Sequence, residues 1–466
     1  MTDSPSPGQS TPAHSRPPAS LHLRKASQTT SICPVCRKLV PALIFESEGE
    51  VLMSKTCSEH GTTKSLISSD PRLYEESFQY NFPGKLHLIK SHATEYRGNC
   101  PLDCGICPEH LQHTCAAMIE VTNRCNLTCP VCYMRANEGP NRTPSMEDIK
   151  KTLGILVRSE TNPPSLTVTG GEPTLREDLP EIVRLAKEMG FSDISLSTNG
   201  VVPAKRPSLL AELATAGLTE VSISFDGLDD AVYMKTRGLP LLETKLNAID
   251  AALAAGLSVT VSATIINGVN RDQIGRIVAF AKEKHLDGVN FSPMAFVGRY
   301  PEEFFRPGER ATIPDVLREI EAQTKGELVV SDFVPVPCPD NRCSTMTYVF
   351  NDGKELTPLT DYCDVRSYLD VYGEKVSCCD WVFAALDKLW SMSAVPGSEK
   401  VMKNVGILSP EAHSTDQIMT VSVHSFQDPW TLDVQRVKKC CIHVAEPDRI
   451  VPLCAYNNLY RWRPVA

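Results

Sequence analysis

Three cysteines in one short loop have the spacing of an iron–sulfur ligand set. Cys125, Cys129 and Cys132 are arranged C-x3-C-x2-C directly after the apolar run at residues 117–121. Thiolates at this spacing can occupy three corners of an iron–sulfur cube, which leaves the fourth iron without a protein ligand. Such an iron can bind a small molecule and donate an electron to it. The alternative is a structural zinc site or a cluster closed by a fourth cysteine.

This loop resembles the cluster loop of the radical S-adenosylmethionine (SAM) superfamily. The resemblance lies in the cysteine spacing, in Tyr133 directly after the third cysteine, and in the strand-like run before the first. In that family the amino and carboxylate groups of SAM chelate the open iron, and reduction cleaves SAM to a 5′-deoxyadenosyl radical. The resemblance implies that Cys125, Cys129 and Cys132 hold a SAM-binding [4Fe-4S] cluster.

The segments around the loop alternate between strand-like and helix-like patterns over residues 114–330. Such alternation is typical of α/β proteins with a parallel sheet, and in barrels the functional residues follow the C-terminal ends of the strands. The predicted strands are 117–121, 165–169, 193–197, 220–225, 258–266 and 288–293. The predicted helices are 146–159, 179–189, 207–216, 239–255 and 271–284. Six such units resemble the partial (β/α)6, TIM-like barrel of radical SAM enzymes.

Polar and glycine-rich turns follow three of the predicted strands. They begin at Thr169 (TGGEP), Ser197 (STNG) and Ser224 (SFDG), and Arg237 with its following glycine lies further on. Each turn alone is a weak signal, because glycine-rich turns after strands are routine. Their order on successive strands resembles the SAM-binding loops of the family, in which a GGE loop binds the SAM amino group. The resemblance implies SAM contacts from Gly170, Gly171, Glu172, Thr198, Asn199, Ser224 and Asp226.

A separate metal site is predicted near the start of the chain, in a small zinc-ribbon or rubredoxin-like unit at residues 31–70. Cys33 and Cys36 form one C-x2-C turn, and Cys57 and His60 lie on a second turn after an alternating apolar stretch. Two such turns facing each other across a hairpin form a tetrahedral site for one zinc or iron ion. The alternative for His60 is a surface histidine before a turn glycine.

A second C-x3-C-x2-C set, formed by Cys100, Cys104 and Cys107, lies in a linker at residues 71–113. No strand-like run precedes it, so we interpret it as an auxiliary cluster, with a role as the SAM site as the alternative. Cys115 is either its fourth ligand or a buried thiol, because free cysteine is among the most buried residue types.

The C-terminal region at residues 331–466 is also rich in cysteine. Adjacent pairs at 378–379 and 440–441 cannot easily give both thiolates to one cluster, because neighbouring side chains in an extended chain point to opposite faces. One cysteine of a pair can then bind metal while the other holds a soft substrate. Several of these residues are otherwise ordinary buried thiols. The predicted ligands of a second auxiliary cluster are Cys338, Cys343, Cys441 and Cys454.

Composition narrows the class of protein. The chain has 466 residues, 42% hydrophobic and 22% charged, and its formal charge of −9 argues against general nucleic-acid binding. No apolar run approaches the roughly 18–20 residues that span a bilayer. The 18 cysteines favour metal binding in a reducing cytoplasm over disulfides. Residues 1–30 are rich in Ser, Pro and Thr and are predicted to be a disordered tail.

The order of all these motifs after residue 30 is similar to that of archaeal tetraether lipid synthase and pterin methyltransferase-like radical SAM proteins. The resemblance implies an enzyme with auxiliary iron–sulfur clusters that acts on a small molecule or a lipid and receives electrons from a donor such as flavodoxin or ferredoxin. Its radical would form a new carbon bond by C–C coupling or methylation.

Two other functions remain open from the sequence. The first is transfer of the 3-amino-3-carboxypropyl group of SAM to a soft metalloid acceptor, such as thiol-bound trivalent arsenic in arsinothricin-type biosynthesis. The second is a non-enzymatic iron–sulfur electron carrier or metal sensor, against which the GGE loop argues. No catalytic side chain beyond the ligands above is predicted.

Overall fold

The computed structural model describes residues 26–361 and 418–461. Most of the predicted tail therefore lies outside the described residues, and the first strand already begins at Ser27. The cysteines at 363, 378 and 379 also lie outside them, so the roles predicted for the pair at 378–379 stay predictions.

The N-terminal unit is an antiparallel sheet in the order β1-β2-β3-β4. Glu48 and Gly49 connect β2 to β3 with positive φ angles of 55° and 80°, as expected for a tight hairpin turn. Apolar residues alternate along β2 and β3, and their buried face packs on Tyr74 of the following helix. The elements are β1 (Ser27–Ile32), β2 (Leu39–Ser47), β3 (Glu50–Cys57), β4 (Gly61–Ser68) and α1 (Pro71–Glu76).

Six parallel strands, β5 to β10, form the central sheet in sequence order. Their positions agree closely with the six predicted strands. They are β5 (Ala116–Glu120), β6 (Ser165–Thr169), β7 (Ile194–Thr198), β8 (Glu220–Ser224), β9 (Ser258–Ile265) and β10 (Gly288–Pro293).

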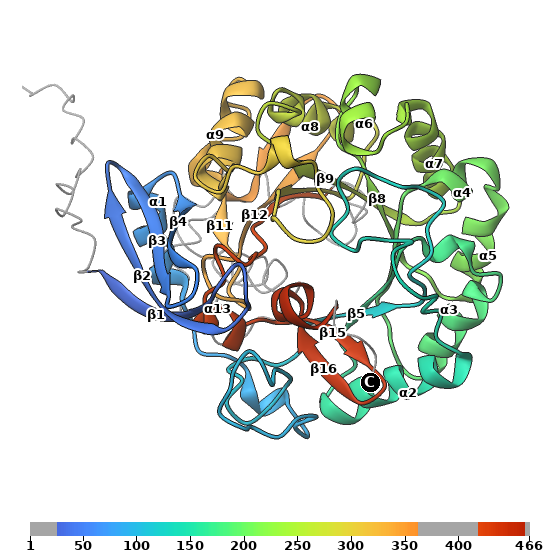
Figure 1. The fold of residues 1–466 in the computed structure, drawn as a ribbon. Coiled ribbons are helices and arrows are strands. Elements are labelled where there is room, and N and C mark those ends of the chain that lie inside the picture. Colours follow the sequence, from blue (N-terminus) through green and yellow to red (C-terminus); the bar gives the residue numbers. More distant parts are fainter. Residues whose placement is uncertain (1–25, 362–417, 462–466) are drawn as a thin grey trace, which may run out of the picture.

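Helices cover the outside of this sheet as an outer arc (Figure 1). In α2, Ser145 caps the N-terminus by accepting a hydrogen bond from Asp148 N, and the Asp148 carboxylate accepts one from the Ser145 N–H. Ile149, Leu153 and Leu156 then place one apolar face on the core. The helices are α2 (Met146–Ser159), α3 (Leu179–Glu188), α4 (Val201–Lys205), α5 (Ser208–Ala216), α6 (Asp230–Thr236), α7 (Leu242–Ala254), α8 (Ile274–Glu283) and α9 (Ile313–Gln323).

The C-terminal part of the chain adds a parallel strand to each edge of this sheet. β14 pairs with β10 on one side, and β15 pairs with β5 on the other. Antiparallel strands then flank both additions, because β12 pairs with β14 and β16 pairs with β15. These elements are β11 (Val334–Pro335), β12 (Ser344–Asn351), β13 (Leu356–Pro358), β14 (Ile418–His424), α13 (Val434–Lys438), β15 (Ile442–Glu446), β16 (Arg449–Pro452) and α14 (Leu453–Ala455). The predicted partial barrel is confirmed, and its sheet is wider than six strands.

The N-terminal unit docks on the segment that follows β14. The buried Lys55 ammonium donates to the Pro429 main-chain oxygen at 2.7 Å and to Ser31 Oγ at 2.9 Å. Ser31 Oγ in turn donates to Leu432 O at 2.5 Å. These buried contacts hold the unit beside the barrel, where Figure 1 shows it in blue. Among the described helices, none is long and apolar enough to cross a membrane.

Candidate metal and SAM site

The cysteine loop after β5 is held by the side chain of Asn137. Its Oδ1 accepts a hydrogen bond from Cys125 N at 2.9 Å, and its Nδ2 donates to the main-chain oxygens of Cys125 and Leu127 at 3.0 and 3.2 Å. Asn137 has a positive φ of 70°, a region that asparagine adopts more readily than most residues. One side chain therefore closes the loop and fixes the direction of its first cysteine.

The three thiols of this loop are wholly or partly withdrawn from solvent, because Cys129 is buried and Cys125 and Cys132 are half-buried. Burial foremost, and then the charges of Glu172, Cys129 and Cys132, raise the pKa of Cys125 to about 11. A bound cation favours the thiolate form of such a group. The role predicted for the three sulfurs, as three corners of an iron–sulfur cube, stays a prediction.

The glycines of the GGE turn allow its backbone to lie against the cysteine loop. A Cβ on Gly170 would meet Thr122 O at 2.3 Å, and one on Gly171 would meet Arg124 O at 2.2 Å. The same approach creates hydrogen bonds from Gly171 N to Thr122 O at 2.7 Å and from Glu172 N to Arg124 O at 2.8 Å. Side chains at 170 and 171 would push the two loops apart.

The Glu172 carboxylate is fully buried and connects two strand ends. One oxygen accepts from Thr174 N, Thr174 Oγ1 and Thr198 Oγ1 at 3.1, 2.5 and 2.7 Å, and the other accepts from Asn199 N at 2.7 Å. Glu172 therefore holds the loop after β6 against the loop after β7. The contact between Glu172 and the SAM amino group stays a prediction.

Asn199 and Ser224 meet through a residue that the sequence analysis did not identify, Lys245. The Lys245 ammonium donates to Asn199 O at 2.6 Å and to Ser224 Oγ at 2.9 Å. Asn199 Nδ2 also approaches Asn126 Oδ1 at 2.7 Å and Cys125 Sγ at 3.6 Å. The predicted SAM residues of two strand ends thus lie together beside the first cysteine.

Lys245 lies on α7 and has no exposed surface. Burial foremost, and then the Arg237 charge, lower its pKa to about 7. A signal for it was present in the sequence, because Lys245 precedes Ala248, Ile249 and Ala252 at helical spacing and so shares their buried face. A lysine on such a face needs acceptors in the core, and the two strand ends supply them.

Asp226 forms a buried ion pair with Arg237. The Arg237 Nε and Nη2 atoms donate to the two carboxylate oxygens at 2.6 and 3.0 Å, while Thr236 Oγ1 and Thr264 N donate at 3.0 and 3.1 Å. Burial alone would raise the pKa of Asp226, but Arg237 outweighs this effect and the pKa is lowered. Burial raises the pKa of the Cys129 thiol, and the nearby Arg237 charge opposes this effect.

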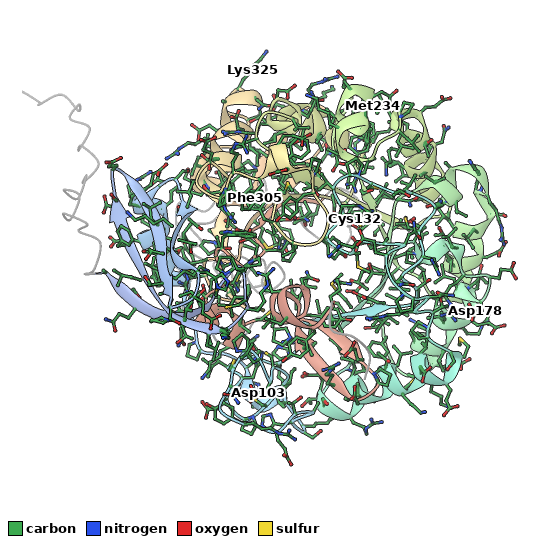
Figure 2. The ribbon with its side chains drawn as sticks, viewed as in Figure 1. Asp103, Cys132, Asp178, Met234, Phe305 and Lys325 are labelled. Atoms are coloured by element: carbon green, nitrogen blue, oxygen red, sulfur yellow. The ribbon has the colours of Figure 1, made fainter. Side chains whose placement is uncertain are left out.

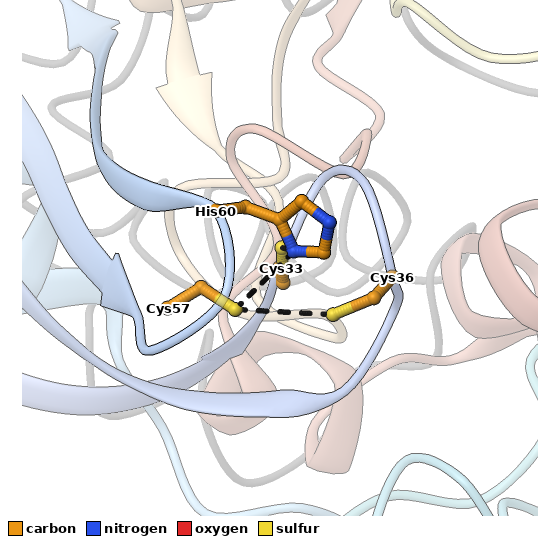
Figure 3. Close-up of side chains that lie close together, drawn as sticks. All are labelled: Cys33, Cys36, Cys57 and His60. Atoms are coloured by element: carbon orange, nitrogen blue, oxygen red, sulfur yellow. Dashed lines mark hydrogen bonds between the residues drawn. The ribbon is translucent and has the colours of Figure 1, made fainter.

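The four predicted ligands of the N-terminal unit converge on one point (Figure 3). Cys36 Sγ lies 3.9 Å from Cys57 Sγ, and His60 Nδ1 lies 3.5 Å from Cys57 Sγ and 3.7 Å from Cys33 Sγ. These separations match the edges of a tetrahedron around one zinc or iron ion, since the metal–ligand bonds are about 2.0–2.3 Å long. The structure therefore gives His60 the position of a ligand.

Cys440 lies within electrostatic range of two groups of auxiliary cysteines, the first with Cys100, Cys104 and Cys107 and the second with Cys343 and Cys454. A hydrogen bond from Cys100, then burial, then the charges of Cys107 and Cys440 raise the pKa of Cys104. Burial and then the charges of Cys454 and Cys343 raise the pKa of Cys440. Asp103 lies between Cys100 and Cys104 in the sequence, and Figure 2 shows it well away from Cys132.

Three further cysteines are Cys115, Cys338 and Cys441. Cys441 accepts hydrogen bonds at its main-chain oxygen from Cys115 N and Ala116 N at 2.9 and 3.2 Å. The Cys115 thiol lies 3.3 Å from His113 Nε2, and Cys338 is buried. The ligand roles predicted for the auxiliary cysteines stay predictions, for Cys100, Cys104, Cys107, Cys338, Cys343, Cys441 and Cys454 alike.

A cavity of about 510 Å³ lies beside the cysteine loop, where β5 and β15 end. Glu120, Glu446 and Tyr456 line it together with Met134, which follows the third cysteine. Its volume is within the range of small-molecule sites. Polar and apolar groups are therefore available for a substrate next to the proposed cluster.

Comparison with known proteins agrees with this geometry. The sequence profile described as the Radical SAM superfamily matches residues 119–281, and the profile of the HMPTM N-terminal zinc ribbon domain matches residues 26–69. The chain is 36% identical to 7,8-dihydro-6-hydroxymethylpterin dimethyltransferase of Methanocaldococcus jannaschii, over 93% of this chain and 94% of that protein. The chain belongs to the radical SAM superfamily. It is a radical SAM enzyme, and [4Fe-4S] and SAM are its cofactors.

Other similarities cover less of this radical SAM enzyme. It is 30% identical to a probable GTP 3′,8-cyclase of Saccharolobus islandicus, over 39% of this chain and 57% of that protein. Its structure is similar to that of Streptococcus suis SuiB bound to S-adenosylmethionine, with 18% identity over 46% of this chain and 48% of that chain. With a TM-score of 0.38, this similarity supports no conclusion about the fold or the function. The pterin dimethyltransferase, which matches nearly the whole chain, is more informative about function.

Proposed function

We propose that this radical SAM enzyme transfers methyl groups to a 7,8-dihydropterin that carries a 6-hydroxymethyl group. Each methyl group comes from a second SAM, which leaves as S-adenosylhomocysteine, and replaces a hydrogen atom that becomes part of 5′-deoxyadenosine. The reductant supplies two electrons per methyl group. The observation that carries the proposal is the 36% identity to the pterin dimethyltransferase, which extends over nearly the whole of both chains. Both the metal-binding unit and the barrel lie within that span. Methyl transfer is the methylation alternative among the carbon-bond reactions expected from the sequence, and no comparison supports aminocarboxypropyl transfer to arsenic.

Residues of this chain have separate tasks in the proposed reaction. Cys125, Cys129 and Cys132 hold the [4Fe-4S] cluster, which supplies one-electron cleavage of SAM when both are bound. The GGE turn and Asn199 line the loop side of the SAM site, and Lys245 keeps Ser224 beside Asn199. Because Glu172 and Lys245 are buried and hydrogen-bonded, these loops are positioned before SAM arrives.

The cavity beside the cysteine loop is the proposed pterin site. The 2-amino group and ring N–H of a pterin are neighbouring donors, which suit a carboxylate that accepts two hydrogen bonds. Glu120 and Glu446 line the cavity, and Tyr456 supplies a ring face for the bicyclic system. These groups support a planar, donor-rich substrate over a long lipid chain.

Further metal sites and an electron donor complete the proposal. We assign one zinc or iron ion to Cys33, Cys36, Cys57 and His60, and auxiliary clusters to the two groups of auxiliary cysteines near Cys440. A radical SAM enzyme needs a reductant, and flavodoxin or ferredoxin is the donor we propose. A reducing cytoplasm is supported because every cysteine among the described residues is a free thiol.

The test is to incubate the reduced, metal-reconstituted enzyme with SAM and 7,8-dihydro-6-hydroxymethylpterin and to follow the pterin by mass spectrometry. A gain of one or two methyl groups is expected, and Cys129→Ala is expected to abolish it. Unchanged pterin from an enzyme that still cleaves SAM would overturn the substrate assignment. Methylthioadenosine without 5′-deoxyadenosine would favour aminocarboxypropyl transfer instead.

A further inference from the structure

The C-terminal end of helix α6 packs against the middle of the cysteine loop, which runs over residues 125–132. Val131 N donates to Thr236 O at 3.3 Å, so the last turn of α6 and the loop share a main-chain hydrogen bond. Gly238 has a positive φ of 80°, and a Cβ there would lie 3.4 Å from Pro130 Cδ. This close approach fixes Arg237, between Thr236 and Gly238, beside Cys129.

The Arg237 guanidinium is oriented by Asp226. Two parallel hydrogen bonds at 2.6 and 3.0 Å fix its plane, and the Asp226 carboxylate has no exposed surface. The Val131–Thr236 hydrogen bond and the contact of Gly238 with Pro130 hold Arg237 near Cys129. Arginine keeps its charge in proteins, so a positive charge stays near this sulfur at every working pH.

We propose that Arg237 raises the reduction potential of the SAM-binding cluster by holding a fixed positive charge beside the Cys129 sulfur. The inference rests on the proposed assignment of Cys125, Cys129 and Cys132 to that cluster. It adds a role for Arg237 and Asp226 that holding SAM alone does not require.

The sign of the change in reduction potential follows from charge. Reduction adds one negative charge to the cluster, and a nearby cation stabilises the reduced state. Asp226 offsets part of the Arg237 charge while it holds the guanidinium in place. Removing Arg237 therefore lowers the potential, whereas neutralising Asp226 raises it.

The experiment is a redox titration of the reconstituted enzyme followed by electron paramagnetic resonance. The SAM-binding cluster is identified by the part of the signal that changes when SAM is added. We compare wild type with Arg237→Met, Arg237→Lys and Asp226→Asn. Arg176→Met is the matched control, because Arg176 is a similarly buried arginine that pairs with Asp178 and donates to Val121 O at 2.9 Å.

The expected result is a shift to more negative potential in both Arg237 variants, larger for Met than for Lys, and a shift to more positive potential in Asp226→Asn. The control and the auxiliary clusters should keep their wild-type potentials. A wild-type potential in Arg237→Met with a full complement of iron would overturn the inference. Loss of cluster iron in both Arg237 variants would also overturn it, because Arg237 would then be purely structural. If Cys125→Ala retains the SAM-responsive signal, the cluster assignment itself is wrong.

Discussion

Cys132 and Arg299 exchange two main-chain hydrogen bonds, with N···O distances of 2.8 and 2.9 Å. Arg299 Nε also donates to Cys129 O at 2.8 Å, and its Nη1 pairs with Glu138 at 2.9 Å. The loop after β10 therefore supports two of the three proposed SAM-cluster ligands. Neither the spacing of the cysteines nor the family resemblance pointed to this residue.

We expect Arg299→Ala to weaken the cluster site without unfolding the barrel. The variant keeps the main-chain hydrogen bonds but loses two side-chain contacts. The bond from the charged Nε to Cys129 O contributes about 1.5–3 kcal/mol, and the partly exposed pair with Glu138 about 0–1 kcal/mol. Iron should be lost to a chelator several times faster than from wild type. Arg306→Ala, on an exposed part of the same loop, is the control, and equal rates in the two variants would contradict the prediction.

Replacing Lys245 by Met should weaken SAM binding by about tenfold. The Asn199 oxygen and the Ser224 hydroxyl would each lose a buried partner, and a lost hydrogen bond of this kind costs about 1–1.5 kcal/mol. The measurement is the SAM dissociation constant from titration calorimetry of the reconstituted enzyme. The reduction potential of the cluster serves as a second readout, and unchanged SAM affinity would show that Lys245 only fills the core.

The same lysine should make stability depend on pH. Its pKa is about 7 in the folded chain, against 10.5 for an ordinary lysine, so the unfolded chain binds more protons between these limits. The free energy of unfolding of wild type should therefore rise relative to Lys245→Met by up to about 1.4 kcal/mol per pH unit as the pH increases from 7 to 10. Denaturant titrations at several pH values check the slope, and parallel curves for the two proteins would contradict it.

The N-terminal metal site should depend on His60 as well as on its three cysteines. We expect His60→Ala to retain the metal but to release it more readily to a competing chelator, and Cys57→Ser to lose it. Because the unit is small, metal loss should also expose β1 to β4 to proteolysis. Glu59→Ala, which removes an exposed partner of Lys38, should behave as wild type. Identical metal affinity in His60→Ala would remove His60 from the ligand set.

Cys440 and Cys441 should differ in their effect on iron content. Cys440 interacts electrostatically with cysteines of both auxiliary groups, so Cys440→Ser should lose a larger share of auxiliary iron than Cys441→Ser. Iron analysis of the two reconstituted variants, normalised to the SAM-responsive signal, makes the comparison. The prediction is wrong if Cys441→Ser loses as much iron or more.

The sequence predicted the elements whose signals are local. The six central strands are apolar runs bounded by turn residues, and the metal site of the N-terminal unit follows from two short turns. The pairing of β14 and β15 with the sheet edges was not predictable in this way, because it depends on contacts between residues distant in the chain. Arg299 was missed for the same reason, because it acts on a loop from another part of the sequence. Lys245 has a local signal on the buried face of its helix, but the strand ends that it binds are distant in the chain.

Because β14 and β15 come late in the chain, the two edges of the central sheet are paired late during synthesis. On the ribosome, β5 and β10 emerge long before residues 418–446 that pair with them. Until then both edges of the growing sheet present unpaired backbone groups, which favour association with other chains. A nascent chain that stalls between β10 and β14 should therefore depend on chaperones, and the Cys104 region meets Cys440 only after the C-terminal region has been made.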